Sequence, residues 1–333
     1  MPFEVIHSGQ HHDAALSDIF FEELALPQPD VRLTVEPDVP GAMIGAMLAG
    51  LEALFARRRP SGLLVFGDTN TTLAGTLAAA RLGIRLGHIE AGPRTGQADQ
   101  PEEINRIIAD RLSQLRFCAD ARSLANLQAE ALGAGSHLTG DLMLDAWQQV
   151  GARTALPALP PGFAPGTFVL LTAHRAANTD TDAALSGLER LVGELGLPVV
   201  LPLHPRTRAA LAAAGRLDRV LATDGLAVLP PQGYPATVAL TRAALAVVTD
   251  SGGLQREACF AGRRAIVLDE TTPWPDLAAA GWIEVAGQLA GLDPASVRTA
   301  ALAPAPQTGI GALLGDGRAA ASICDVLVRE GWI

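Results

Sequence analysis

Residues 244–261 read Ala-Leu-Ala-Val-Val-Thr-Asp-Ser-Gly-Gly-Leu-Gln-Arg-Glu-Ala-Cys-Phe-Ala. The apolar run from Ala244 to Thr249 predicts a buried strand, and the residues after Gly253 have the spacing of a helix. Between them, two glycines let a ligand approach the backbone where free N–H groups and the helix dipole favour a phosphate. The pattern is equally typical of a plain turn in which Ser251 only caps the helix. The segment therefore predicts an α/β fold and leaves open whether the turn binds phosphate.

Glu257 lies one turn into this predicted helix and faces the same site if the helix begins at the glycine pair. A carboxylate does not favour a phosphate, but it accepts hydrogen bonds from neutral hydroxyls such as a ribose diol. An exposed first-turn acid that complements the helix dipole explains Glu257 equally well. The segment has neither the Gly-Lys-Ser/Thr of a P-loop nor a GxGxxG pattern, so neither of those nucleotide motifs is present.

Outward from this segment, the chain alternates short apolar runs with helical patterns, as βαβ units do. Residues 151–166 interrupt the alternation with four prolines, which neither continue a helix nor fit a central strand. We therefore expect a first lobe at 1–150, a linker at 151–166 and a second lobe at 167–333, with the last helix a candidate to return to the first lobe. The expected strands are residues 3–6, 62–66, 86–89, 167–172, 198–202, 244–249 and 264–268, and the expected helices include 41–57 and 71–82.

The fold class that follows is α/β, with two Rossmann-like doubly wound lobes and a cleft between them. Open parallel sheets bind ligands at the carboxyl ends of their strands, and the polar motifs of this chain lie at those ends.

Composition excludes several classes of protein. The chain has 333 residues, which suggests two domains, and a formal net charge of −10, which argues against nucleic-acid or anionic-membrane partners. No apolar run approaches the roughly 20 residues that span a bilayer, and the N-terminus has no secretion signal, so we expect a cytoplasmic protein. Cys118, Cys259 and Cys324 are far apart in apolar sequence, which favours buried reduced thiols.

The first lobe carries carboxylates at predicted strand ends. Asp68 and Glu90 directly follow consecutive strands, so both lie at the carboxyl edge of the sheet and could share one site. Paired acids can divide general-acid and general-base work, because repulsion and desolvation separate their pKa values. Alternatively, Asp68 caps the next helix, and Glu102 and Glu103 are ordinary first-turn acids behind a proline. We favour a functional role for Glu90 and a structural one for Glu103.

Two His-Arg clusters follow strands of the second lobe. His174-Arg175 comes after the strand at 167–172, and residues 204–208, His-Pro-Arg-Thr-Arg, come after the strand at 198–202. Arginine offers a bidentate fork and histidine one or two donors, so these clusters predict anion contacts. A zinc site is the competing interpretation, and we reject it because the seven histidines are scattered without a ligand set.

Taken together, these segments resemble the non-hydrolysing UDP-N-acetylglucosamine 2-epimerases. The resemblance implies a GT-B-like arrangement of two Rossmann-like lobes, a homodimer, and no metal or cofactor. It also implies reversible conversion of UDP-GlcNAc to UDP-ManNAc by anti elimination of UDP and syn re-addition. The motifs that carry the resemblance are, in chain order, Gly9-Gln10-His11, Gly67-Asp68-Thr69-Asn70, His88-Ile89-Glu90-Ala91-Gly92, Pro101-Glu102-Glu103-Ile104-Asn105-Arg106, Thr172-Ala173-His174-Arg175, His204-Pro205-Arg206-Thr207-Arg208, Thr249-Asp250-Ser251-Gly252-Gly253 and Gly315-Asp316-Gly317.

Residue roles follow from the same resemblance. The catalytic carboxylates implied by position are Asp68, Glu90 and Glu102, while His174 with Arg175 would stabilise negative charge on the departing UDP. The implied UDP-binding residues are Arg175, Ser251, Gly252, Gly253 and Glu257. A second, activating site for UDP-GlcNAc is implied at Gln10, His11 and His204.

The chain also departs from the family pattern. It begins about one βα unit later than family members, without their Gly-Thr-Arg-Pro-Glu loop, so the first lobe is expected to lack its first βα unit. Ala177 replaces the acid of the family's His-Arg-x-Glu-Asn motif, and residues 269–276 differ from the usual Glu-Thr-Glu-Trp-Pro-Glu type of segment. These departures make a sugar-nucleotide-binding protein without turnover an alternative. A hydrolysing homologue that releases ManNAc and UDP is another, because it shares the elimination step, and a GT-B glycosyltransferase is less favoured.

Overall fold

The computed structural model describes residues 3–10, 21, 23–24, 26–35, 39–97, 99–155 and 158–333. The chain forms two compact units, the first from Met1–Ala146 together with Leu313–Ile333, and the second from Trp147–Ala312. Residues 151–166, the expected linker, belong to the second unit. The final helix, α16 (Ala319–Arg329), belongs to the first.

The first unit contains a parallel sheet of four strands in the order β3-β4-β5-β6, which are β3 (Gly62–Phe66), β4 (Arg85–Ile89), β5 (Leu115–Cys118) and β6 (Ser136–Leu138). A separate parallel pair is formed by β1 (Ile6–His7) and β2 (Val31–Arg32). In the register of the larger sheet Phe66 lies opposite Ile89, and Ile89 lies opposite Phe117. The turns after β3 and β4 therefore leave the sheet side by side.

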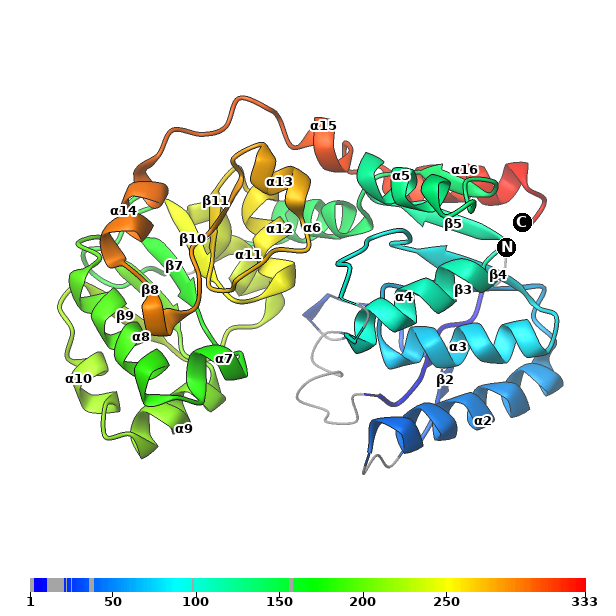
Figure 1. Cartoon of the computed structure of the whole chain (residues 1–333), viewed down its shortest axis with the longest axis horizontal. Helices are drawn as coiled ribbons and strands as arrows, with labels where there is room; N and C mark the ends of the chain where they lie inside the picture. The colour runs from blue at the N-terminus through cyan, green and yellow to red at the C-terminus, as the bar shows by residue number, and fades with distance from the viewer. Residues whose placement is uncertain are drawn as a thin grey trace. The chain divides into compact units, whose positions relative to one another are not determined.

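Helices cover this sheet (Figure 1). Those of the first unit and its boundary are α2 (Pro40–Arg58), α3 (Asn70–Arg81), α4 (Pro101–Leu112), α5 (Ala121–Ala129), α6 (Leu142–Arg153), α15 (Gly311–Leu314) and α16. Three buried apolar residues of α16 pack on Ile89, Leu115 and Phe117 of the sheet, namely Ile323, Val326 and Leu327. The Asp145 carboxylate accepts hydrogen bonds from the first two N–H groups of α16. A segment far along the sequence thus completes the core of the first unit.

The second unit contains a parallel sheet of six strands in the order β12-β11-β10-β7-β8-β9. Its strands are β7 (Val169–Thr172), β8 (Val199–Pro202), β9 (Leu226–Leu229), β10 (Ala246–Thr249), β11 (Arg264–Val267) and β12 (Ile283–Val285). The chain builds one half of the sheet from β7 to β9, and then returns to the other side of β7 to build the second half from β10 to β12. This is the doubly wound order of a Rossmann fold, in which ligands bind where the strand order reverses. The reversal lies between β7 and β10.

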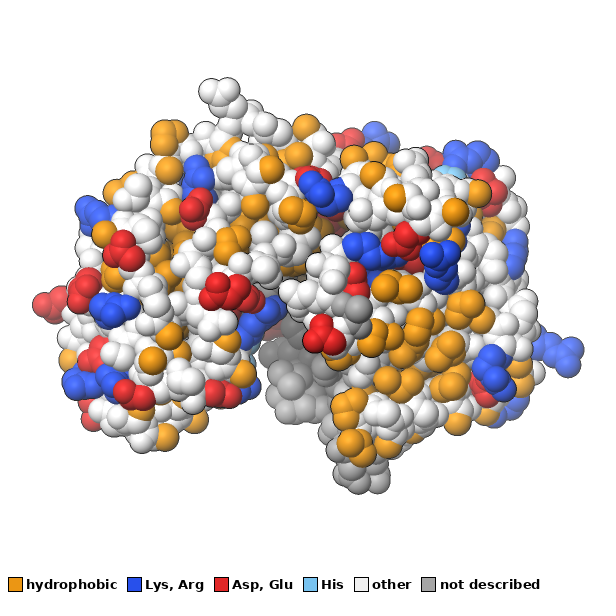
Figure 2. Space-filling view, viewed as in Figure 1, with side chains coloured by type: hydrophobic (Ala, Val, Ile, Leu, Met, Phe, Trp, Pro, Cys, Tyr) orange, Lys and Arg blue, Asp and Glu red, His pale blue; other side chains and the backbone are white. Residues whose placement is uncertain are grey.

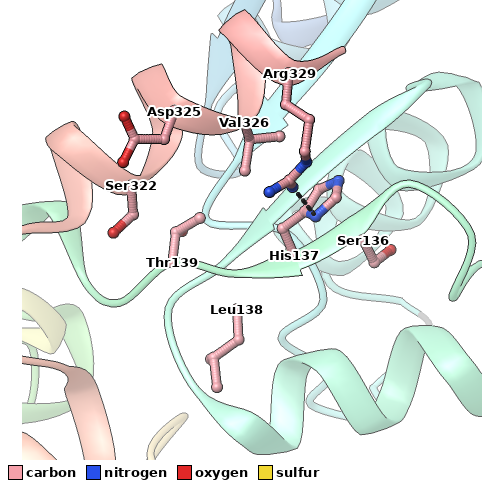
Figure 3. Close-up of a pocket in the computed structure, with 8 residues that line it drawn as sticks. All are labelled: Ser136, His137, Leu138, Thr139, Ser322, Asp325, Val326 and Arg329. Atoms are coloured by element: carbon pink, nitrogen blue, oxygen red, sulfur yellow. Dashed lines mark hydrogen bonds between the residues drawn. The ribbon is translucent and has the colours of Figure 1, made fainter.

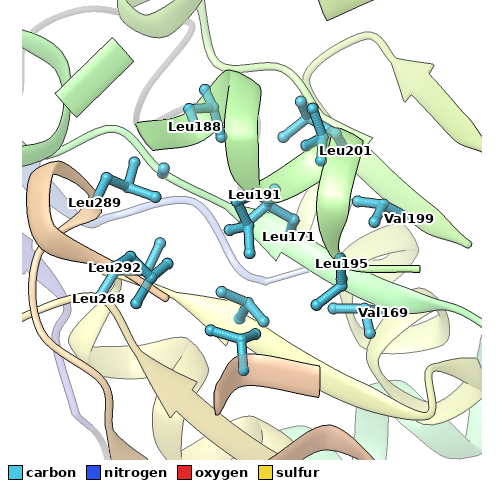
Figure 4. Close-up of a cluster of buried hydrophobic side chains, with 14 of the residues drawn as sticks. Val169, Leu171, Leu188, Leu191, Leu195, Val199, Leu201, Leu268, Leu289 and Leu292 are labelled. Carbon is cyan, nitrogen blue, oxygen red and sulfur yellow. The ribbon is translucent and has the colours of Figure 1, made fainter. Parts of the chain in front are cut away.

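The core of the second unit lies between its sheet and α8 (Asp182–Glu194), as Figure 4 shows for Leu188, Leu191 and their neighbours. Helix α8 also packs closely on the 3-10 helix η1 (Leu289–Gly291): a Cβ atom on Gly187 would lie 1.9 Å from the Leu289 carbonyl oxygen, so only glycine fits there. The remaining helices are α7 (Ala176–Thr179), α9 (Pro205–Ala213), α10 (Leu217–Leu221), α11 (Tyr234–Ala243), α12 (Gly252–Phe260), α13 (Pro275–Ala279) and α14 (Pro294–Leu302).

The structure confirms the α/β fold with parallel sheets in both units. The expected strand at 62–66 has the bounds of β3, whereas the one at 3–6 is wrong: the strand is Ile6–His7, and Phe3 is exposed. Cys118 and Cys259 are buried free thiols, but Cys324 is exposed because α16 turns its apolar side, and not Cys324, toward the sheet. None of the described helices is long and apolar enough to cross a membrane.

Candidate functional site

The turn after β10 leads directly from a buried strand into the N-terminus of a helix. Ser251 is the N-cap of α12, and its hydroxyl accepts from the Leu254 N–H at 3.4 Å. The first N–H groups of a helix have no partner within the helix, and here they follow directly on a buried strand. A Cβ atom on Gly252 would lie 3.8 Å from a guanidinium nitrogen of Arg175. A cation and the positive end of a helix therefore meet at this turn.

Asp250, which precedes the N-cap, connects the turn to the loop after β7. The residue is fully buried, and its Oδ2 accepts from the backbone N–H groups of His174 and Arg175, both at 2.8 Å, and from the Asn178 amide at 3.2 Å. Both sides of the reversal point are thereby held together. No role for Asp250 was predicted from the sequence. Its position was a usable signal, because a carboxylate between a buried strand and a turn suited to phosphate must have hydrogen-bond donors of its own.

The His174 and His204 side chains lie together, next to Asp250. Their rings stack with centroids 5.2 Å apart, and His174 Nδ1 lies 3.2 Å from Asp250 Oδ1. His204 is the N-cap of α9, and its Nδ1 accepts from the Arg206 N–H at 3.2 Å. Burial lowers the pKa of His204, and repulsion from His174 lowers it further. Because Nδ1 accepts the hydrogen bond from Arg206, Nε2 is the nitrogen that carries the proton in a neutral His204 ring.

Arg175 lies between the glycine turn and an acid. Its Nη1 is 3.1 Å from Asp269 Oδ2, on the loop that follows β11, and the side chain is half exposed. Glu257 lies in α12 and is 6% exposed, so the interpretation of it as an exposed first-turn acid is wrong.

In the first unit, Asp68 follows β3 but does not cap the next helix. Thr69 is the N-cap of α3, and its hydroxyl accepts from the Thr72 N–H at 3.4 Å. The Asp68 carboxylate instead accepts from Nη2 and Nε of Arg106 at 2.6 and 3.0 Å. The Asn105 amide donates to the Asp68 carbonyl at 2.8 Å. Two consecutive residues of α4 therefore hold Asp68 at the edge of the sheet.

Glu90 follows β4 in a left-handed backbone conformation, with φ of 68°. This conformation is strained for a residue other than glycine and often marks a functional position. A Cβ atom on Gly67 would lie 3.7 Å from Glu90 Oε2, so the Glu90 carboxylate faces the Gly67–Asp68 turn. The structure thus brings Asp68 and Glu90 to adjacent strand ends of one sheet.

Both first-turn acids of α4 follow Pro101, but they differ in environment. Glu102 is exposed, whereas Glu103 is 3% exposed and accepts from the Thr95 and Gly96 N–H groups and from Arg106. The interpretation of Glu103 as an ordinary first-turn acid is therefore wrong. Burial acts to raise its pKa, but the two backbone donors and Arg106 outweigh burial and leave the pKa of Glu103 below its ordinary value. Arg106 bridges Glu103 and Asp68.

The residues of the expected second site are divided between the units. The Gln10 side-chain oxygen accepts from the Thr71 N–H at 2.9 Å and from the Thr71 hydroxyl at 2.8 Å, at the start of α3. His11 lies outside the described residues. His204 belongs to the second unit.

The first unit also has a surface pocket between β6 and α16, lined by residues 136–139 and by Ser322, Asp325, Val326 and Arg329 (Figure 3). Arg329 extends to His137 there, with 3.5 Å between Nη2 and Nδ1. None of the site residues expected from the sequence lines this pocket. Within the described part of the chain, no cluster of three or more His, Cys, Asp or Glu side chains is arranged to hold a metal ion.

A helix N-terminus beside a guanidinium group at the reversal point of a Rossmann-type sheet, in a chain that also carries acids at adjacent strand ends of a second parallel sheet, is an arrangement typical of nucleotide-binding α/β enzymes. Residues 1–328 match the family model described as UDP-N-acetylglucosamine 2-epimerase, and the chain belongs to this family. The family expected from the motifs is therefore confirmed, and with it the isomerase class.

Individual relatives of the chain carry epimerase names that agree with this family. The chain is 37% identical over 332 residues, 98% of its own length and 91% of the relative's, to the UDP-2,3-diacetamido-2,3-dideoxy-D-glucuronate 2-epimerase of Pseudomonas aeruginosa. It is 34% identical to the UDP-N-acetylglucosamine 2-epimerase of Methanococcus maripaludis, over 89% of this chain and 82% of that one. The crystal structure of the Methanocaldococcus jannaschii UDP-GlcNAc 2-epimerase in complex with UDP-GlcNAc and UDP matches with a TM-score of 0.82 at 27% identity, covering 99% of this chain and 92% of that one.

Replacement of Glu103 by glutamine should destabilise the protein by about 1–3 kcal/mol at pH 7, because an amide donor would face groups that themselves donate. The wild-type advantage should be complete above the pKa of an unfolded glutamate. It should disappear as the pH falls through the lower pKa of folded Glu103. Urea unfolding followed by circular dichroism at several pH values measures this difference. The matched Glu102→Gln change, at an exposed position, should alter stability by less than about 0.5 kcal/mol; equal losses in both variants would contradict the role of Glu103.

Proposed function

We propose that the protein catalyses reversible C2 epimerisation of a UDP-activated 2-acetamido sugar, such as the conversion of UDP-GlcNAc to UDP-ManNAc, by anti elimination of UDP and syn re-addition. The observation that carries the proposal is the placement of Asp68 and Glu90 at adjacent strand ends, with the Glu90 carboxylate directed at the turn that carries Asp68. The family match supports it.

The reaction requires two proton transfers on opposite faces of one carbon atom. The C2 proton is weakly acidic, so a base must remove it while UDP leaves, and an acid must return a proton from the other face. We assign the two transfers to carboxylates from the set Asp68, Glu90 and Glu102. Arg106 of α4 supports the assignment, because it donates a hydrogen bond to the Asp68 carboxylate. Glu102 lies one turn earlier in the same helix, on the same face as Arg106.

UDP must be held both before and after it leaves the sugar. We assign the diphosphate to the α12 N-terminus at Ser251, Gly252 and Gly253, and the ribose hydroxyls to Glu257. The half-exposed guanidinium of Arg175 beside Gly252 supports this seat. His174 would donate to negative charge that develops on the departing UDP.

A second substrate is favoured by one comparison. The relative at 37% identity is named for UDP-2,3-diacetamido-2,3-dideoxy-D-glucuronate, whereas the one at 34% is named for UDP-N-acetylglucosamine. Both sugars carry an acetamido group at C2, so the same elimination and re-addition would serve either. The diacetamido-glucuronate sugar differs from N-acetylglucosamine by a second acetamido group and a carboxylate.

Incubation of the protein in deuterated water with each of these two UDP sugars, followed by NMR, tests the proposal. Deuterium at C2 together with the opposite epimer is expected. Free sugar with UDP would indicate a hydrolysing enzyme, and a bound but unchanged sugar would indicate a binding protein. Glu90→Gln should lower C2 exchange by about 100-fold or more while UDP binding is retained. The matched Glu52→Gln, in α2, should exchange like the wild type; unchanged exchange in Glu90→Gln would remove Glu90 from the mechanism.

The UDP seat can be tested separately by calorimetry with UDP alone. The double change Ser251→Ala and Gly252→Ala should weaken UDP binding about tenfold or more, because the added methyl group obstructs close approach of the diphosphate. The protein should still fold, since a Cβ atom on Gly252 has no neighbour closer than 3.8 Å. Gly193→Ala on α8, where a Cβ atom has no neighbour within 4 Å, is the control. Equal UDP affinity in the wild type, the double variant and Gly193→Ala would exclude the α12 N-terminus as the diphosphate site.

We also propose a homodimer. Apolar side chains gather over α3 and α4 in Figure 2, and Ile104, Ile107 and Leu112 of α4 are 44%, 37% and 37% exposed. Sedimentation velocity should give about twice the chain mass of 34.5 kDa. Ile107→Glu should shift the protein to the monomer, and a wild-type monomer at all concentrations would rule the dimer out.

A further inference from the structure

Two fully buried polar residues lie beneath the turns that carry Asp68 and Glu90. His88 of β4 and Asp110 of α4 are both 0% exposed. The distance between His88 Nδ1 and Asp110 Oδ1 is 2.7 Å. On the other side of the ring, His88 Nε2 is 2.7 Å from the carbonyl oxygen of Gly67.

Both ring nitrogens of His88 therefore face oxygen atoms. A carbonyl oxygen can only accept, so Nε2 carries a hydrogen and donates to Gly67. Nδ1 and the Asp110 carboxyl group share the second hydrogen bond, so each of these two buried polar groups satisfies the other.

The second oxygen of Asp110 is also used. Oδ2 accepts from the Gly92 N–H at 3.2 Å, and Nη1 of Arg94 lies 2.8 Å from it. Arg94 is held in turn by both oxygens of Glu130, at 2.7 and 3.0 Å. His88, Asp110, Arg94 and Glu130 thus form one network that connects α4 and the C-terminal end of α5 to the loop after β4.

The network reaches both of the turns that carry the proposed catalytic acids. The Gly67 carbonyl immediately precedes Asp68, and the Gly92 N–H comes two residues after Glu90. Glu90 itself is in the left-handed region, a conformation that persists only where neighbouring contacts enforce it. His88 and Asp110 therefore fix one turn relative to the other.

We propose that His88 and Asp110 are positioning residues for the C2 proton transfers: they do not touch the sugar but set the separation and direction of Asp68 and Glu90. This inference rests on the proposed function. A displacement of about 1 Å at a reacting group can lower a rate about 100-fold, so a loosened turn should affect turnover much more than binding.

The variants His88→Gln and Asp110→Asn test the proposal. Each leaves part of the network unmatched, and in Asp110→Asn an amide donor would face the Gly92 N–H or Arg94. At temperatures where circular dichroism shows the variants to be folded, C2 exchange at saturating UDP sugar should fall by about 10- to 100-fold, with KM and the Kd for UDP changed by less than about threefold. Both the rate and the affinity are measured on the same preparations.

Asp145→Asn is the matched control. Asp145 is a buried acid of the same unit that accepts two backbone N–H groups, but those groups belong to α16 and not to the acid-bearing turns. Its replacement should lower the melting temperature and leave C2 exchange of the folded protein within about twofold of wild type. Exchange in the His88 and Asp110 variants equal to that in Asp145→Asn would overturn the positioning role.

Amide hydrogen exchange gives a readout that does not depend on substrate. Protection of the Gly92 N–H should fall by about tenfold or more in His88→Gln, because the Asp110 carboxyl group then loses the ring that fixes its other oxygen, and should be unchanged in Asp145→Asn. Unchanged protection in His88→Gln would overturn the proposal whatever the activity. A wild-type protein that shows no C2 exchange with either sugar would overturn the proposed function, and the positioning of the turns would then be decided by the amide protection alone.

Discussion

A carboxylate that is shielded from water must receive its hydrogen bonds from the protein, and both units use this requirement to hold a site loop in place. Asp110 receives the Gly92 N–H, just after the strand end that carries Glu90. Asp250 receives the N–H groups of His174 and Arg175. In each case the buried acid belongs to one element and its donors to another, so the sheet edge is fixed by bonds across elements as well as by strand pairing.

This explains which parts of the site could be predicted from the sequence. In parallel sheets polar residues directly after buried strands lie at one edge, and this rule predicts the positions of Asp68, Glu90, His174 and Ser251 at strand ends, where the structure has them. The partners of these residues could not be found in the same way. Asp68 bonds to Arg106, a residue 38 positions away, and leaves the helix cap to Thr69. Such choices depend on which helix packs beside the turn.

The fold shows the same division. Strand β3 is a continuous apolar run, and its sequence alone defines its bounds. Strand β5 is not predicted from the sequence, because it contains Arg116, whose charge is typical of a surface residue. In the structure Arg116 is buried and donates to the carbonyl oxygens of Ser113 and Ala134. Glu103 was misjudged for a related reason: its donors come from a loop with no periodic signal. Hydropathy describes a side chain by itself, whereas burial of a charge depends on donors and acceptors elsewhere in the chain.

The first unit is discontinuous in sequence, and this has a consequence for synthesis on the ribosome. The apolar face made by Ile89, Leu115 and Phe117 is covered by α16, which is translated only after the whole of Trp147–Ala312. The second unit is continuous, so its core can close while that face of the first is still open to water. Domains generally fold from the N-terminus onward during translation. Here the first unit begins to emerge first but is completed last. Its apolar face therefore stays exposed to water while residues 147–312 are synthesised.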